Sequence, residues 1–235
     1  MESQIKVVFE NENFIVINKP SGLVVNRSQT VKDTATLQDY LNENIEIESD
    51  DDLESEFNKR NGIVHRLDKD TSGIILVAKN DSYFVYLQSL FKERLIKKEY
   101  VAVVLGKVGE ERFEIDAPIG RDPKSRFRFA IVRGEKESQT YFERIKVTNE
   151  GETNFTSLHC FPKTGRTHQI RVHLAAYGFP ILGDSTYSSQ RDCNLYENLG
   201  ISRLMLHSKS VTFNGINGEN FSFECEIPEE FSKFM

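Results

Sequence analysis

The sequence predicts an α+β protein built on a mixed, largely antiparallel sheet. Two observations predict this class. Runs with the alternation and composition of strands outnumber helical segments, and a polar turn joins the two N-terminal runs as in a hairpin. The 235 residues can bury a substantial core, and their 38% hydrophobic and 28% charged content is typical of globular proteins.

The predicted strands begin with the N-terminal hairpin, in which residues 6–9 and 14–17 flank the turn at 10–13. Pro20 and Gly22 end this hairpin, because both residues favour turns. The further strands are expected at residues 74–78, 100–105, 139–147, 156–161, 204–213 and 221–227.

The chain also favours helices in three places. One opens at residues 36–41, a second begins at a cap on Asp81 or Ser82 and runs to about Lys92, and a third begins at a cap on Thr167. A glycine and a proline directly after the third helix end it. The apolar residues that share a helical face are Phe84, Leu87 and Phe91 in the second helix and Ile170, Leu174 and Tyr177 in the third.

No repeat or low-complexity linker divides the chain, so one domain is expected over residues 1–235, and the one break in composition predicts an acidic loop insert at 43–57. That segment contains eight acidic residues and no basic one. A like-charge block of this kind is typical of a solvated loop, and a segment that mimics RNA is the less favoured interpretation. Without these eight acids the net charge of −6 becomes +2. The balance therefore counts only mildly against an RNA-binding role.

Composition excludes several classes of protein. No apolar stretch could span a membrane, and residues 1–20 have no secretory signal pattern. Three widely spaced cysteines indicate neither a disulfide framework nor a zinc site, and they suit the reducing cytoplasm. The five histidines lack the spacing of paired metal ligands, so no metal site is expected.

Asp68 is the candidate reactive group. It ends the run His65-Arg66-Leu67-Asp68, just before the apolar strand at 74–78. A solvated acid that caps a turn is the alternative, but a half-buried carboxylate requires a cationic partner. Arg171 is the best candidate partner, since it stands within an apolar stretch, although an exposed helix position is an even alternative. Arg166 competes for this role or contacts phosphate.

Aromatic and basic residues provide candidate RNA contacts. Tyr100 begins a strand, where core packing is the usual role, but its ring could stack on a base and its hydroxyl could move a proton. Between residues 121 and 129, arginines alternate with phenylalanines as in a solvated hairpin. We expect Phe127 and Phe129 to point inward, while Arg126 and Arg128 reach phosphates.

Several motifs together resemble the RluA-type pseudouridine synthases, over nearly the whole chain. The run His65–Asp68 followed by Thr71-Ser72-Gly73 resembles the catalytic motif of that family. The other matching runs are Asn18–Leu23, Lys98-Glu99-Tyr100, Gly165–His173, Pro180–Asp184 and the Leu204–His207 region.

The resemblance implies the pseudouridine synthase fold, a two-halved catalytic domain with a central RNA-binding cleft. It implies that Asp68 is the catalytic aspartate, that Tyr100 is the active-site tyrosine, and that Arg171 pairs with the aspartate. Arg66 would enter the RNA stack where the target base leaves. The remaining candidate RNA-binding residues are His65, Arg166, His168, Arg126 and Arg128.

The function implied is isomerisation of chosen uridines in ribosomal or transfer RNA, by base flipping and exchange of the glycosidic bond at the aspartate. This reaction requires no cofactor. The expected partner is a structured RNA stem-loop, without membrane or DNA, for a cytoplasmic monomer that lacks a separate N-terminal RNA-binding domain. Two alternatives remain: a non-catalytic RNA-binding or RNA-folding protein on the same scaffold, and a hydrolase that uses Asp68 as a general base.

Overall fold

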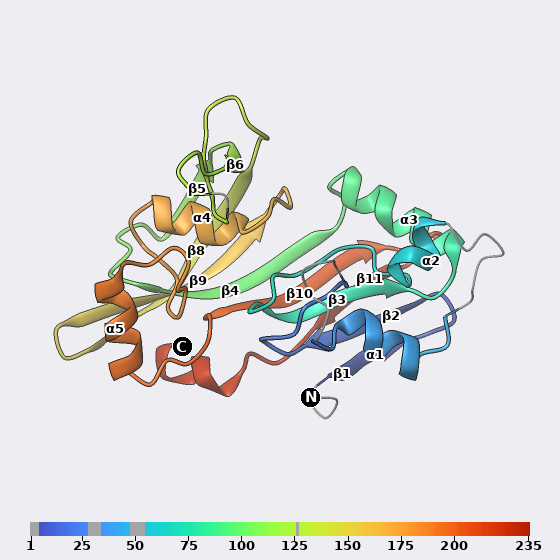
Figure 1. The fold of residues 1–235 in the computed structure, drawn as a ribbon, viewed down its shortest axis with the longest axis horizontal. Coiled ribbons are helices and arrows are strands. Elements are labelled where there is room, and N and C mark those ends of the chain that lie inside the picture. The colour runs from blue at the N-terminus through green and yellow to red at the C-terminus, as the bar shows by residue number, and fades with distance from the viewer. Residues whose placement is uncertain (1–4, 28–33, 48–54, 126) are drawn as a thin grey trace. The chain divides into compact units, whose positions relative to one another are not determined.

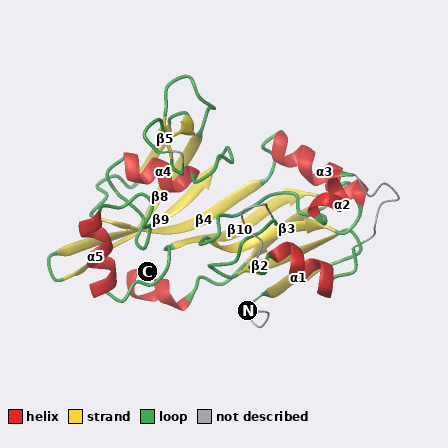
Figure 2. Cartoon of the chain, viewed as in Figure 1, coloured by secondary structure: helices red, strands yellow, loops and turns green. Residues whose placement is uncertain are grey.

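The computed structural model describes residues 5–27, 34–47, 55–125 and 127–235. The chain divides into two compact units. Unit 1 contains the described residues of Met1–Lys97 with Lys209–Cys225, and unit 2 contains those of Lys98–Ser208 with Glu226–Met235. Strands dominate both units (Figure 2).

Unit 1 is a sheet with helices on both faces. Strands β1 (Lys6–Glu10), β2 (Phe14–Lys19) and β3 (Ser72–Ala78) pair antiparallel in that order. Next comes β10 (Leu206–Asn214), which pairs antiparallel with β11 (Asn220–Glu224).

Alternation along β2 and β3 determines how the helices of unit 1 pack. Ile15 and Ile17 lie in one apolar cluster with Leu37 and Leu41 of α1 (Leu37–Asn44). Phe14 and Val16 lie in a second cluster on the other face, with α2 (Glu56–Arg60) and α3 (Asp81–Lys92). Both faces of these strands are therefore buried, as is every residue of β3. Figure 1 shows the three helices beside these strands.

The main strands of unit 2 pair antiparallel in the order β4-β9-β8-β5. These strands are β4 (Lys97–Leu105), β5 (Arg112–Asp116), β8 (Gln139–Glu150) and β9 (Thr153–Pro162). A short hairpin joins β6 (Ile119–Arg121) to β7 (Phe129–Ile131). The helices are α4 (Gln169–Ala176), α5 (Gln190–Asn198) and a terminal 3-10 helix, Glu229–Phe234.

The predicted fold class is confirmed, as are the predicted strands apart from end residues. The helix caps were predicted less well. The side chain of Asn80, one residue before the predicted cap, accepts the Tyr83 N–H and begins α3. Helix α4 begins after His168 rather than at Thr167, and His168 has a left-handed backbone with φ of 56°. Phe127 is 90% exposed, so the expectation that it points inward is wrong.

The acidic segment is only partly described. Glu43 lies in α1, and Glu56 and the buried Phe57 lie in α2, while residues 48–54 fall outside the described residues. The two ends of the segment are therefore helical rather than loop, and the insert itself stays a prediction. Within the described ranges, no helix is both long and apolar enough to cross a membrane.

Candidate active site and RNA-binding residues

Asp68 stands at the start of a tight turn in unit 1. Its carbonyl accepts the Thr71 N–H at 3.2 Å, and β3 begins at the next residue, Ser72. Leu67 beside it is buried, while the Asp68 side chain is half-buried. A carboxylate on such a turn is fixed by the buried strand that follows and still reaches the surface.

Lys19 holds this turn through its side chain, a role that was not predicted from the sequence. Its side chain is fully buried, and its ammonium donates to the carbonyls of Pro20, Leu23 and Lys69 at 2.8, 2.9 and 3.0 Å. The Gly22 N–H donates to the same Lys69 carbonyl at 2.9 Å. A buried ammonium requires this full set of acceptors, so Lys19 ties the end of β2 to the residue after Asp68.

His65 and Arg66 precede Asp68 but have different surroundings. The Leu76 N–H donates to His65 Nε2 at 2.8 Å, and the imidazole centroid lies 4.6 Å from the Phe91 ring. These contacts give His65 a structural role in unit 1, and its predicted contact with RNA stays a prediction. Arg66 is exposed, as a residue that contacts RNA must be.

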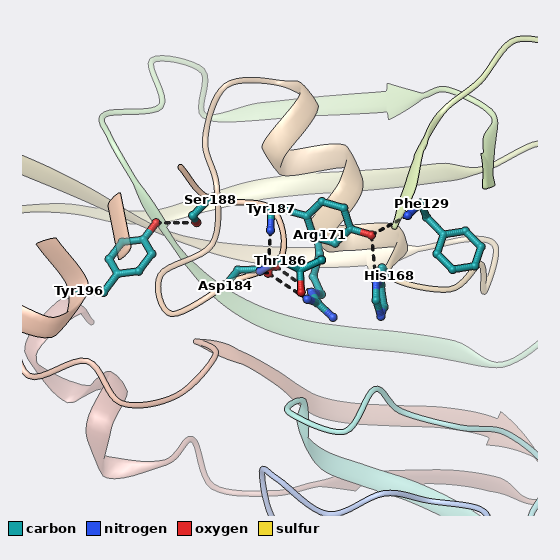
Figure 3. Close-up of polar contacts among 8 residues, drawn as sticks. All are labelled: Phe129, His168, Arg171, Asp184, Thr186, Tyr187, Ser188 and Tyr196. Atoms are coloured by element: carbon teal, nitrogen blue, oxygen red, sulfur yellow. Dashed lines mark hydrogen bonds and ion pairs between the residues drawn. The ribbon is translucent and has the colours of Figure 1, made fainter. Parts of the chain in front are cut away.

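Arg171 is buried in unit 2, where Asp184 holds it in a bidentate ion pair (Figure 3). Arg171 Nε donates to Asp184 Oδ2 at 2.7 Å and Nη2 donates to Oδ1 at 2.9 Å. Both residues are at most 5% exposed. The packed position expected for Arg171 is confirmed. Its expected pairing with Asp68 joins residues of different units and stays a prediction, while Asp184 is a partner that spacing did not suggest.

Tyr187 contacts this ion pair from the same turn. Its ring centroid lies 5.2 Å from Arg171 Cζ and also 5.2 Å from Arg128 Cζ. Its hydroxyl accepts the Phe129 N–H at 3.1 Å and lies 2.9 Å from His168 Nδ1 (Figure 3). His168, predicted to face RNA, is therefore hydrogen-bonded inside unit 2.

Tyr100 is half-buried on β4, opposite Cys160 of β9. Lys98, two residues earlier, lies on the same face of the strand. Burial lowers the pKa of Lys98 to about 8, and its ammonium donates to the Thr164 carbonyl at 3.4 Å. The Tyr100 ring packs at the edge of the unit 2 core, so the packing role and a role at the site both remain compatible with its position.

The loop before α4 is fixed by Gln169. The buried side-chain amide of Gln169 accepts from Thr164 Oγ1 and from the Arg166 N–H, and it donates to the Gln139 carbonyl and to Thr140 Oγ1. Arg166 Nε donates to the Glu137 carbonyl at 3.0 Å, and its side chain is half-exposed. Arg166 can therefore still present part of its guanidinium to a phosphate.

The β6–β7 hairpin carries the predicted basic stretch. Arg128 is half-buried against Tyr187, and Arg126 lies outside the described residues. Among the residues that the structure describes, no group of three or more His, Cys, Asp or Glu side chains is arranged to hold a metal ion.

Comparisons with known proteins find matches over most of this chain. Residues 13–176 match the family model described as RNA pseudouridylate synthase. Ribosomal large subunit pseudouridine synthase D of Nitrosomonas europaea is 40% identical over 98% of this chain and 64% of its own length. An uncharacterized RNA pseudouridine synthase of Bacillus subtilis, YlyB, is 32% identical over 97% of this chain and 71% of its own.

A solved structure is similar over a comparable range. The structure titled Human RNA Pseudouridylate Synthase Domain Containing 1 has a TM-score of 0.76 and 26% identity, over 98% of this chain and 86% of that one. The chain spans less than two thirds of the Nitrosomonas protein. The residues compared nevertheless include the Asp68 turn, the Tyr100 strand and Arg171.

Proposed function

This chain belongs to the RNA pseudouridylate synthase family, and on that basis we propose that it isomerises uridine to pseudouridine in RNA. The observation that carries the proposal is the position of Asp68, half-buried on a turn fixed by buried Lys19 and by β3. A carboxylate held at the surface of a rigid element is suited to react with a nucleotide that has left its stack.

The reaction exchanges one glycosidic bond for another. The bond between uracil N1 and ribose C1′ breaks, the uracil turns, and C5 bonds to C1′. C5 then gives up its proton to solvent and N1 takes one up, so the product is an isomer of the uridine. Asp68 either forms a covalent intermediate with the nucleotide or removes a ribose proton to give a glycal. We propose Asp68 for this step under both routes.

Tyr100 and Arg171 are the other proposed catalytic residues. The Tyr100 ring is suited to stack on the flipped uracil, and its hydroxyl is suited to assist loss of the C5 proton. Arg171 provides a cation that its ion pair with Asp184 keeps in one orientation. Arg66, which is exposed beside Asp68, is proposed to fill the space that the flipped base leaves.

We propose ribosomal RNA as the substrate class, because the names of the relatives in Nitrosomonas europaea and Borreliella burgdorferi specify the ribosomal large subunit. Arg166 and Arg128 are proposed phosphate contacts, and Arg126 is proposed with them from the sequence alone. We also expect the target to be a stem-loop, which transfer RNA and ribosomal RNA both contain. A cytoplasmic monomer remains our expectation for the protein.

Tritium release tests the proposal. RNA labelled at uridine C5 is taken from cells that lack this protein and incubated with the wild-type chain or with Asp68→Asn. We expect release by the wild type and at least a thousandfold slower release by Asp68→Asn, since the amide can neither attack nor accept the proton (roughly 10³ from loss of a nucleophile or base). Fractionating the RNA by size identifies the substrate class.

Asp70→Asn is the matched control. Asp70 is exposed two residues later on the same turn, and it is its backbone carbonyl that accepts from Ser21 Oγ, at 2.7 Å. Release unchanged by Asp70→Asn and abolished by Asp68→Asn would assign the chemistry to Asp68. No release from wild type that binds RNA would favour the binding and folding protein, whereas free uracil or cut strands would indicate a hydrolase.

A further inference from the structure

Tyr187 contacts two arginines for which different roles are proposed. Arg128 lies on the β6–β7 hairpin, just before β7, and is a proposed phosphate contact, while Arg171 on α4 is a proposed catalytic residue. Both guanidinium carbons lie 5.2 Å from the centroid of the Tyr187 ring. An aromatic ring attracts cations through its negative face, so one side chain helps to place both.

The Tyr187 hydroxyl connects the same two elements through hydrogen bonds. It accepts the N–H of Phe129, the first residue of β7, at 3.1 Å. It also lies 2.9 Å from Nδ1 of His168, the residue that caps α4 (Figure 3). The hydroxyl therefore joins the hairpin to the start of the helix that carries Arg171.

Asp184 fixes Tyr187 and Arg171 to each other. Asp184 Oδ1 accepts the backbone N–H groups of Thr186 and Tyr187 at 3.0 and 3.2 Å. The same carboxylate forms the bidentate pair with Arg171. Because Arg171 and Asp184 are buried and the same Asp184 oxygen accepts the Tyr187 N–H, a shift of the Tyr187 backbone would change the geometry of the ion pair.

Arg128 has a donor available for a ligand. Its Nε is buried and has no hydrogen-bond partner within the described part of the chain. A buried N–H without an acceptor is costly, so a shift of Arg128 toward an RNA phosphate would give this donor a partner. Phe127 beside it is 90% exposed, which places this hairpin at the surface where RNA would bind.

We propose that Tyr187 is a positioning residue that couples phosphate binding at Arg128 to the orientation of Arg171. RNA seated on the hairpin draws Arg128 and β7 toward it, and the Tyr187 ring and hydroxyl pass this change to α4. The inference rests on the proposed isomerase function. Tyr187 touches neither the reacting base nor the ribose; it acts through Arg171.

The test is single-turnover tritium release from uridine-labelled total RNA, with the full chain in excess. The rate at saturating protein and the half-saturating concentration are measured for wild type, Tyr187→Phe, Arg128→Gln and the double variant. Tyr187→Phe keeps the ring but removes the hydroxyl, so we expect the saturating rate to fall about tenfold with little change in half-saturation. Arg128→Gln should raise the half-saturating concentration and also lower the saturating rate.

The double variant distinguishes coupling from a structural defect. With the hydroxyl absent but the ring kept, Arg128→Gln should still raise the half-saturating concentration, and it should lower the saturating rate by a clearly smaller factor than it does in wild type. Independent, multiplying losses of rate would overturn the inference, as would a Tyr187→Phe rate equal to that of wild type. If wild type released no tritium, the proposed function would fail first and the inference with it.

Tyr196→Phe is the matched control for damage to the turn. Tyr196 is buried on α5, and its hydroxyl lies 3.0 Å from Ser188 Oγ, next to Tyr187 in the chain (Figure 3). Within the described part of the chain, the structure shows no contact between Tyr196 and Arg128 or Arg171. An unchanged rate in Tyr196→Phe, with similar thermal midpoints for both variants, would support the positioning role. An equal loss in both variants would contradict it.

Discussion

At the scale of single residues, the proposed catalytic residues Asp68 and Arg171 are held in place by residues that are distant in the sequence. Asp68 and Arg171 were recognisable from motif and apolar flanks. Lys19, which holds the Asp68 turn, stands 49 residues before Asp68. Asp184, which pairs with Arg171, stands 13 residues after it. Both stand in runs that resemble family motifs, yet only the fold shows what they contact.

Lys19→Met should lower the free energy of unfolding by about 2 kcal/mol. Methionine fills the space and avoids burying a charge, but three carbonyls lose their ammonium donor. Urea denaturation measures the change. Lys69→Met removes an exposed ammonium from the same turn and should stay within about 0.5 kcal/mol of wild type. Equal stability of wild type and Lys19→Met would show that the carbonyls find other donors.

His207 should make unit 2 sensitive to acid. Burial, together with repulsion from Arg203, lowers the pKa of His207 to about 4. Between pH 6.5 and 4 the unfolded chain therefore binds the proton more tightly than the folded one. The contribution of neutral His207 to the free energy of unfolding is complete above about pH 6.5. It falls by about 3 kcal/mol as the pH drops toward 4.

Urea denaturation at a series of pH values checks this expectation. His207→Gln removes the titrating group, so its stability should fall less steeply between pH 6.5 and 4 than that of wild type, even if it is lower throughout. The pKa of His173 is also lowered by burial, but His173 is present in both proteins and does not affect the difference. Parallel curves for the two proteins would rule out the assignment to His207.

At the scale of elements, the sequence predicted those that bury an alternating or helical apolar face. Strands β2 and β3 are buried along almost their whole length, and α3 buries Phe84 and Leu87 as expected. Two of the missed elements are polar or short. Helix α5 buries only Tyr196, and the alternation of Phe113 and Ile115 with charged residues in β5 covers just five positions. Their positions depend on the sheet edge and core that they join.

Gly183→Ala should disrupt the turn that carries Asp184. Gly183 has a φ of +74°, and a Cβ there would overlap the backbone carbonyl of Arg203. We expect a loss of more than about 3 kcal/mol in stability, because left-handed strain and the overlap combine. Gly178→Ala is the control. Gly178 has a similar φ of +94°, but a Cβ added there would meet no atom within 4 Å.

Thermal or urea unfolding of the two alanine variants isolates the overlap from the backbone strain. Gly178→Ala should lose about 1 kcal/mol. Because the Gly183 turn places Asp184, Gly183→Ala should also slow tritium release at saturating RNA. Similar losses of stability in both variants would mean that the Arg203 segment yields without cost.

At the scale of the whole molecule, charge is the property most at odds with RNA binding. The net charge is −6, but eight of the acidic residues fall within residues 43–57. Binding of a polyanion therefore depends on local basic groups rather than on the total. Arg66, Arg128 and Arg166 are the described candidates for such contacts, and they belong to both units.

The salt dependence of RNA binding tests this view. If Arg128 contacts a phosphate, Arg128→Gln should reduce the slope of log affinity against log salt by about one unit, since one fewer counterion is released. Arg112→Gln is the control, because exposed Arg112 already pairs with Glu143 at 2.7 Å and should leave the slope unchanged. Filter binding from 50 to 200 mM salt (roughly the range over which such contacts dominate) measures both. A slope unaffected by Arg128→Gln would remove Arg128 from the phosphate contacts and, with it, the first step of the coupling through Tyr187.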